Sequence, residues 1–148
     1  MGYKISISLL IVFILFAFTI ACEKDHTNTE KSGTTELETG ESRNMEHQKQ
    51  VKLKGTPIHI SFDELVHDFR CPTDVTCVHA GLAEVAMIIK KQDLTTTLHL
   101  TLEAGQPGKA SAVFENYKFT LLEVLPLPNS QVTIPQEDYR IVLRADKI

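Results

Sequence analysis

The chain has 148 residues, of which 43% are hydrophobic and 23% charged, a composition typical of a globular protein. Its formal net charge is −4, and Lys4 is the only charged residue before Cys22, so the rest of the chain carries 14 basic and 19 acidic residues. A surface of that sign repels phosphate backbones, which argues against a nucleic-acid-binding role.

The N-terminus has the pattern of a secretory signal peptide, predicted over residues 1–21. Met-Gly-Tyr-Lys precedes an unbroken run of apolar or hydroxyl-bearing residues from Ile5 to Ile20. As a helix this run would span about 24 Å, less than the roughly 30 Å hydrocarbon core that a permanent membrane span must cross. A signal that is removed is therefore favoured over a retained anchor.

The end of this run, Thr-Ile-Ala-Cys, resembles the lipobox of bacterial lipoproteins, although that pattern prefers leucine where Thr19 stands. The resemblance implies that Cys22 is acylated, with palmitate or a similar chain, and becomes the new N-terminus. The protein would then be lipid-anchored in the bacterial cell envelope, facing the periplasm or the cell exterior. The alternative is a secreted or membrane-anchored protein in which Cys22 is incidental.

Residues 22–50 are predicted to form a disordered polar tether. Leu37 and Met45 are the only large apolar side chains between Glu23 and Gln50. Such a segment cannot bury enough apolar surface to offset the entropy lost on ordering. The remainder, residues 51–148, has the usual size of a single domain.

Apolar residues in this domain alternate with a period of two, which predicts β-strands. The segments are TPIHISF, AEVAMIIKKQ, LTTTLHLTL, NYKFTLLEV and YRIVLRA, with a hairpin turn at KKQD. We expect an all-β domain, a small antiparallel β-sandwich or barrel. The predicted inward-facing residues are Ile58, Ile60, Phe62, Leu98, Leu100, Leu102, Tyr117, Phe119, Leu121, Tyr139, Ile141 and Leu143.

Two segments leave alternatives open. SFDE, residues 61–64, has the form of a capping box and would open a short helix through Val66. LPLPNSQVTIPQED, residues 125–138, contains three prolines and predicts a long loop with at most one edge strand, around residues 132–134. Such a loop either carries a binding surface or rigidly connects two sheets.

Cys71 and Cys77 are predicted to form a disulfide bond, because thiols normally pair in the oxidising space outside the cytoplasm. Acylation of Cys22 leaves these two cysteines to each other. In the chain-entropy model the closed loop would stabilise the fold by roughly 2 to 2.5 kcal/mol. A zinc site using both cysteines and His79 would lack a fourth protein ligand and has unusual Cys-x5-Cys spacing, while copper remains open if the cysteines are reduced.

No catalytic signature is present in the sequence, and we expect neither an enzyme nor a cofactor. A nucleophilic cysteine, with His67 or His79 as its base, would require a free thiolate. His67 and Asp68 could gather with Asp74 and Glu84 into a calcium or acid-base site, but no Asp-x-Asp or Glu-x-x-His pattern supports one. His67 and His79 are thus only weak metal candidates.

The segment RCPTDVTCVHAG, from Arg70 to Gly81, precedes an apolar strand and later F-x-L-x-x-V-x-P and DY-x-x-x-L patterns. In these features the chain resembles a group of small uncharacterised bacterial envelope proteins, over most of residues 51–143. The resemblance implies a β fold and an envelope location but no activity. That pattern has tryptophan where His79 stands, which counts against a shared metal ligand because tryptophan does not coordinate metals.

The same segment yields several local predictions. Arg70 is expected to form an ion pair with Asp68, and Gly81 to supply a backbone turn closed to other residues. Proline should stiffen the loop after Cys71. The residues predicted to present a contact surface are Pro72, Thr73, Asp74 and Thr76.

The function expected from the sequence is a non-catalytic binding module that contacts the bilayer through acylated Cys22. Its partner would be an envelope protein, a peptide or a glycan, and the absence of tryptophan lowers the glycan option. One alternative is a protease inhibitor that presents the Cys71–Cys77 loop, which requires residues 72–76 to project from the sheets. The other is a metal-handling or hydrolytic envelope protein.

Overall fold

Nine strands and two short 3-10 helices make up residues 36–148, the part of the chain that the structure, a computed structural model, describes. No helix in this part is long and apolar enough to cross a membrane. The elements in chain order are β1 (Glu36–Leu37), β2 (Ser42–Glu46), β3 (Gln50–Leu53), β4 (Ile58–Asp68), β5 (Leu82–Lys91), β6 (Leu94–Glu103), η1 (Pro107–Ala110), β7 (Ser111–Phe114), β8 (Tyr117–Leu125), η2 (Gln136–Asp138) and β9 (Arg140–Lys147).

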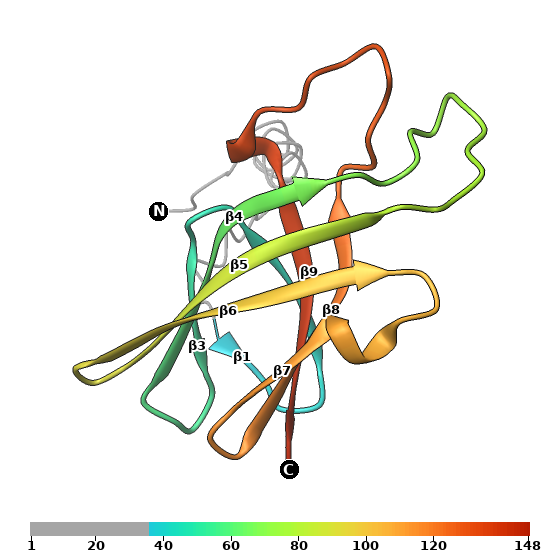
Figure 1. The fold of residues 1–148 in the computed structure, drawn as a ribbon. Helices are drawn as coiled ribbons and strands as arrows, with labels where there is room; N and C mark the ends of the chain where they lie inside the picture. The colour runs from blue at the N-terminus through green and yellow to red at the C-terminus, as the bar shows by residue number, and fades with distance from the viewer. Residues whose placement is uncertain (1–35) are drawn as a thin grey trace, which may run out of the picture. The chain divides into compact units, whose positions relative to one another are not determined.

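The strands form two sheets that enclose a common hydrophobic core (Figure 1). One sheet has the order β1-β3-β4-β5-β6 and the other has the order β2-β9-β8-β7. Neighbouring strands are antiparallel except for β1 and β3, which are parallel. The predicted all-β fold is therefore confirmed, and its architecture is a sandwich.

The core is built by the alternation seen in the sequence. One face of each long strand is apolar and is removed from water, which is the main favourable term in folding. The predicted inward faces are confirmed: Leu98, Leu102 and Tyr117 are partly buried against the core, and the other predicted residues are buried. The hairpin turn predicted at KKQD joins β5 to β6.

The prediction that residues 36–50 belong to a disordered tether is wrong. They contribute β1 to the edge of one sheet and β2 to the edge of the other, so the domain begins before Val51. Leu37 and Met45, the two large apolar side chains of this segment, are each only 1% exposed. The neighbouring strands β3 and β9 supply the backbone hydrogen-bond partners of these two short strands, so one buried side chain is enough to hold each of them in place.

The structure decides between the alternatives at two segments: the capping-box helix is absent, and the predicted long loop is present without an edge strand. The SFDE segment forms no helix, because β4 continues through Asp68 and pairs with β5, with Phe62 opposite Met87 and Leu65 opposite Val85. No strand forms at residues 132–134, where the only pairing is an isolated bridge between Asn129 and Val132. The prolines limit the backbone donors that this loop can offer to a ladder.

The two ends of the sandwich differ. The longest loops, β4–β5 (69–81) and β8–β9 (126–139), lie at one end. At the other end Leu37 accepts a hydrogen bond from the Lys54 amide, and the Ile148 amide donates to Asn116 in the β7–β8 turn. The described chain therefore begins away from the long loops.

Candidate functional site

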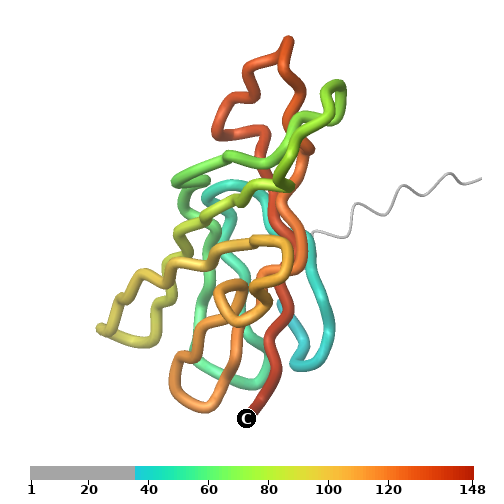
Figure 2. Tube along the Cα trace, turned by 45° about the vertical axis from the view of Figure 1, so that its right-hand side comes forward, coloured from blue at the N-terminus to red at the C-terminus, as the bar shows by residue number. Residues whose placement is uncertain are grey.

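The loops 69–81 and 126–139 lie side by side (Figures 1 and 2), and we call them together the loop end. They contain every residue of the predicted contact surface and both cysteines of the predicted disulfide. Contacts at the base, middle and tip hold them in place. The two loops of the loop end are therefore held in a defined arrangement by specific contacts.

The base of the first loop continues the β4–β5 hairpin. The Phe69 amide donates to Leu82 O at 2.8 Å, and the Cys71 amide donates to Ala80 O at 2.9 Å. Gly81 has a φ of +73°, and a Cβ built there would lie 1.8 Å from the Phe69 carbonyl oxygen. The predicted need for glycine is confirmed, since no other residue fits this conformation and this approach.

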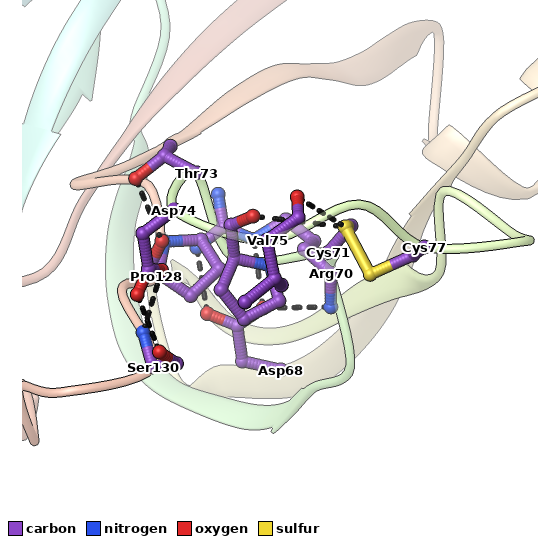
Figure 3. The surroundings of a disulfide bond; sticks show 10 residues. Asp68, Arg70, Cys71, Thr73, Asp74, Val75, Cys77, Pro128 and Ser130 are labelled. Atoms are coloured by element: carbon purple, nitrogen blue, oxygen red, sulfur yellow. Dashed lines mark hydrogen bonds and ion pairs between the residues drawn. A yellow bond between two sulfur atoms is a disulfide. The ribbon is translucent and has the colours of Figure 1, made fainter.

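The disulfide between Cys71 and Cys77 is present and closes the outer part of the loop, with a Cα–Cα distance of 5.9 Å (Figure 3). Both sulfurs are consumed in this bond. They are neither metal ligands nor thiolates in this state, so the zinc, copper and nucleophile alternatives would each require prior reduction. His79, the third ligand in those alternatives, lies exposed on the same loop.

Arg70 ties the first loop to the second. Its guanidinium bonds both carboxylate oxygens of Asp68, with Nε–Oδ1 and Nη2–Oδ2 distances of 2.7 and 2.6 Å, so the predicted ion pair is confirmed. The same group donates to Val124 O, and to Pro126 O at 3.0 Å. The side chains of Asp68 and Arg70 are only 12% and 11% exposed, and a forked, largely buried pair of this kind fixes geometry better than a surface pair.

Asp68 also interacts with the end of the second loop. Tyr139 OH lies 3.4 Å from Asp68 Oδ2. Burial, followed by the negative charge of Asp68, raises the pKa of Tyr139 above its ordinary value, while Arg70 opposes the shift. The phenol is thus neutral at physiological pH and acts as a hydrogen-bond donor.

The tips of the loops are joined by Asp74, whose carboxylate accepts hydrogen bonds from the amide of Ser130 at 2.9 Å and from its hydroxyl (Figure 3). These bonds favour the charged form and lower the pKa of Asp74. Next to it, the Thr73 amide donates to Pro128 O at 3.0 Å. Thr73 and Asp74, predicted as contact residues, therefore hold the neighbouring loop, and both are exposed, as Thr76 is. Pro72, the fourth predicted contact residue, is half-buried.

Large apolar side chains are concentrated on this braced surface. Of the nine exposed in the described part of the chain, five belong to the loop end, and Val78 is 94% exposed. The imidazole of His67 stacks on the Phe69 ring with centroids 5.4 Å apart. The five are Phe69, Val75, Val78, Leu127 and Val132. Sequence reasoning placed the contact surface on neighbouring polar residues and missed them.

The loop end carries a net negative charge. Asp74, Glu137 and Asp138 are exposed, and neither loop contains a lysine. The only arginine in these segments, Arg70, is neutralised by Asp68. The loop end thus combines exposed apolar side chains with exposed carboxylates.

The residues of the hypothetical calcium or acid-base site do not assemble into one site. His67 and Glu84 lie opposite each other in the β4–β5 ladder, but Glu84 contacts His99 at 3.1 Å. Asp68 is bound by Arg70, and Asp74 is bound by Ser130. Within residues 36–148 no three His, Cys, Asp or Glu side chains are grouped as a metal site requires. His99 itself is exposed.

One open hollow of about 620 Å³ lies beside η2, lined by Glu46–Lys49 and Glu137–Arg140. It holds one histidine, His47, whose ring packs edge-on against Phe62 with centroids 5.7 Å apart. No hydrogen bond joins His47 to a carboxylate among the described residues, so an acid-base pair is not assembled there.

The geometry bears on the protease-inhibitor hypothesis in two ways. Residues 72–76 lie beyond the strand ends, as that hypothesis requires. However, they turn, with the Val75 amide 3.4 Å from Pro72 O, and two of them bind the adjacent loop. An inhibitory role remains a prediction.

Cys22, the predicted acylation site, lies outside the described residues. No protein-family model, curated protein or solved structure matches the chain. The resemblances noted in the sequence therefore remain predictions.

Proposed function

We propose that this chain is a bacterial envelope lipoprotein, held to a membrane through acylated Cys22, that acts as a non-catalytic binding module. Its contact surface is the loop end, and its partner is an envelope protein or peptide. The apolar run and cysteine at the N-terminus support the lipid anchor. The described chain enters the domain at Glu36, at the end opposite the long loops.

One observation carries the proposed binding role: five exposed apolar side chains occupy two adjacent loops that hydrogen bonds join to each other. Isolated apolar residues on a surface need no explanation, but a concentration of them marks an interaction site. The disulfide, the Asp68–Arg70 fork and the Asp74–Ser130 contact fix the loops in advance. Such preorganisation lowers the entropy lost on binding.

A protein partner suits this surface better than the other classes. The exposed carboxylates of the loop end repel anionic lipid headgroups and nucleic acid. Glycans are usually held by stacking on aromatic rings, and Phe69 is the only exposed phenylalanine among the described residues. Valine and leucine side chains are complemented by an apolar hollow on another protein.

The test is photocrosslinking in intact cells, with a photoreactive phenylalanine analogue replacing Val78. The matched control carries the analogue at Ile148, which is 66% exposed at the opposite end. We expect one discrete adduct from position 78 and none from position 148. The adduct should disappear when Leu127→Asp, on the facing loop, is added. Equal adducts from both positions, or none from position 78, would contradict the assignment of the loop end.

A further inference from the structure

Four strands form the outer edges of the two sheets, and only β6 is long. The edge strands β1, β7 and β2 have two, four and five residues, and β2 carries Arg43 and Glu46. β6 has ten residues and pairs with β5 without a bulge. Natural proteins protect sheet edges with short strands, charges, prolines or bulges, and β6 has none of these from Leu94 to Leu102.

The outward-facing backbone groups of β6 follow from its register. Lys91 and Leu94 flank a two-residue turn, so they exchange both ladder hydrogen bonds, and every second residue after Leu94 also bonds β5. The residues between them turn their amide and carbonyl groups to the edge. These are Thr95, Thr97, His99 and Thr101, and no strand lies beyond them in the described chain.

The C-terminal part of this edge is partly occupied. η1 follows β6 and packs against it, and Lys109 in η1 bonds Glu103 at 3.1 Å. The accessible stretch is therefore centred on Thr97, with Thr95 and His99 on either side. All three side chains are exposed.

We propose that two copies of this chain pair antiparallel through β6, about a two-fold axis at Thr97, and so join their five-stranded sheets into one. Thr97 then faces its own copy, and Thr95 faces His99 of the partner subunit. Unpaired backbone groups on both sides are satisfied, and no charged side chain of the strand is opposed to a like charge.

The charges beside the strand are compatible with this pairing. On the solvent face of β5, Lys90 lies opposite Thr95, while Glu84 lies opposite Thr101 and contacts His99. In the paired sheets Lys90 lies two strand spacings, about 10 Å, from His99 of the partner subunit. The two Lys90 side chains lie on opposite sides of the axis, so the pairing does not oppose one lysine to the other. This inference uses a different surface from the loop end and does not depend on the proposed function.

Cysteine substitutions test the pairing and its register in the full chain, expressed in cells and analysed on a non-reducing gel. Thr97→Cys places two sulfurs across the axis, within disulfide distance. Thr95→Cys is the matched control on the same edge, because its two copies would lie four residues apart, about 13 Å. We expect a band of doubled mass from Thr97→Cys and at least ten times less from Thr95→Cys. Both variants are treated with the same mild oxidant, and in both the Cys71–Cys77 disulfide is checked to have formed.

A second variant separates pairing from chance collision. Thr97→Lys would place two ammonium groups opposite each other across the axis. Because the side chain at position 97 is exposed, this substitution should leave the fold of each copy intact. Native mass spectrometry of the detergent-released full chain should show a dimer for the unmodified protein and only monomer for Thr97→Lys, whereas Val113→Lys on β7 should remain dimeric. Four results would overturn the proposal: equal crosslinking at positions 95 and 97, no crosslinking by an accessible thiol in the Thr97→Cys variant, a crosslink only to a different protein, or a dimer that survives Thr97→Lys.

Discussion

Replacing Gly81 with alanine should destabilise the domain by about 3 kcal/mol, most of it through a steric conflict with the backbone. The new Cβ would lie 1.8 Å from the Phe69 carbonyl oxygen and 2.7 Å from its carbon. Neither atom can move without opening the base of the loop. Two backbone hydrogen bonds lie there, from the Phe69 and Cys71 amides, and each contributes about 1 kcal/mol.

Gly105→Ala is the matched control. Gly105 has a φ of +79°, close to that of Gly81, but no atom lies within 4 Å of its hypothetical Cβ. Both alanine variants carry the left-handed backbone penalty of roughly 1 kcal/mol. The difference between them, about 2 kcal/mol, isolates the close approach to Phe69.

The assay is urea unfolding of the soluble chain that begins after Cys22, followed by circular dichroism. With a slope of about 2 kcal/mol per molar, the Gly81→Ala midpoint should fall by about 1.5 M and the Gly105→Ala midpoint by about 0.5 M. Hydrogen exchange at the Phe69 and Cys71 amides would detect a loop that opens without global unfolding. The reasoning fails if the two variants are equally stable and both amides keep their protection.

Three further predictions concern the anchor and the Asp68–Arg70–Tyr139 cluster. Cys22→Ser should move the protein from the membrane to the soluble fraction and abolish labelling by a palmitate analogue, and unchanged fractionation would contradict acylation. Arg70→Met leaves the Asp68 carboxylate without its ion-pair partner and leaves two backbone carbonyls without a donor, so the free energy of unfolding should fall by about 3 kcal/mol. Arg70→Lys cannot form the two-point contact with the carboxylate and should not restore the lost stability. The pKa of Tyr139 is raised in the folded state, so the neutral phenol stabilises the fold. This contribution to the free energy of unfolding is fully present below about pH 10, the ordinary tyrosine pKa, and is lost as the pH rises through the folded-state pKa. Ultraviolet titration should therefore show a tyrosine that ionises above the ordinary tyrosine pKa, and Tyr139→Phe should remove that late step.

The long strands were predictable because each carries its own signal. In β6, Leu98, Leu100 and Leu102 alternate with polar residues, and that pattern alone determines which face meets the core. The disulfide was predictable for a similar reason, since assigning Cys22 to the predicted lipid anchor leaves Cys71 and Cys77 with no other partner in the sequence.

The short N-terminal strands were not predictable in this way. Two residues in β1 and five in β2 are too few to show a period, and their hydrogen-bond partners lie on β3 and β9. Only the isolated Leu37 and Met45 hinted at burial. Their strand conformation is a tertiary effect, which propensity and composition do not record.

The loop end shows the same limit. Asp68 and Arg70 are two residues apart, and their pairing was predicted from that proximity. The bonds from Asp74 to Ser130 and from Arg70 to Pro126 join residues 56 apart, and only the fold brings them together. For the same reason the sequence identified the loop but not its supporting contacts, such as those that Thr73 and Asp74 make to the adjacent loop.

The placement of β2 has a mechanical consequence. β2 runs antiparallel to β9, and the chain reaches it from the end opposite the long loops. If the loop end is held while the chain is pulled at Glu36, the two-residue β1 yields first, and the load then passes along the axis of β2. The five paired positions from Ser42 to Glu46 are sheared together and do not peel apart one by one. The pairing of β2 with β9 therefore resists a force that is applied along the strand at the N-terminal end of the described chain.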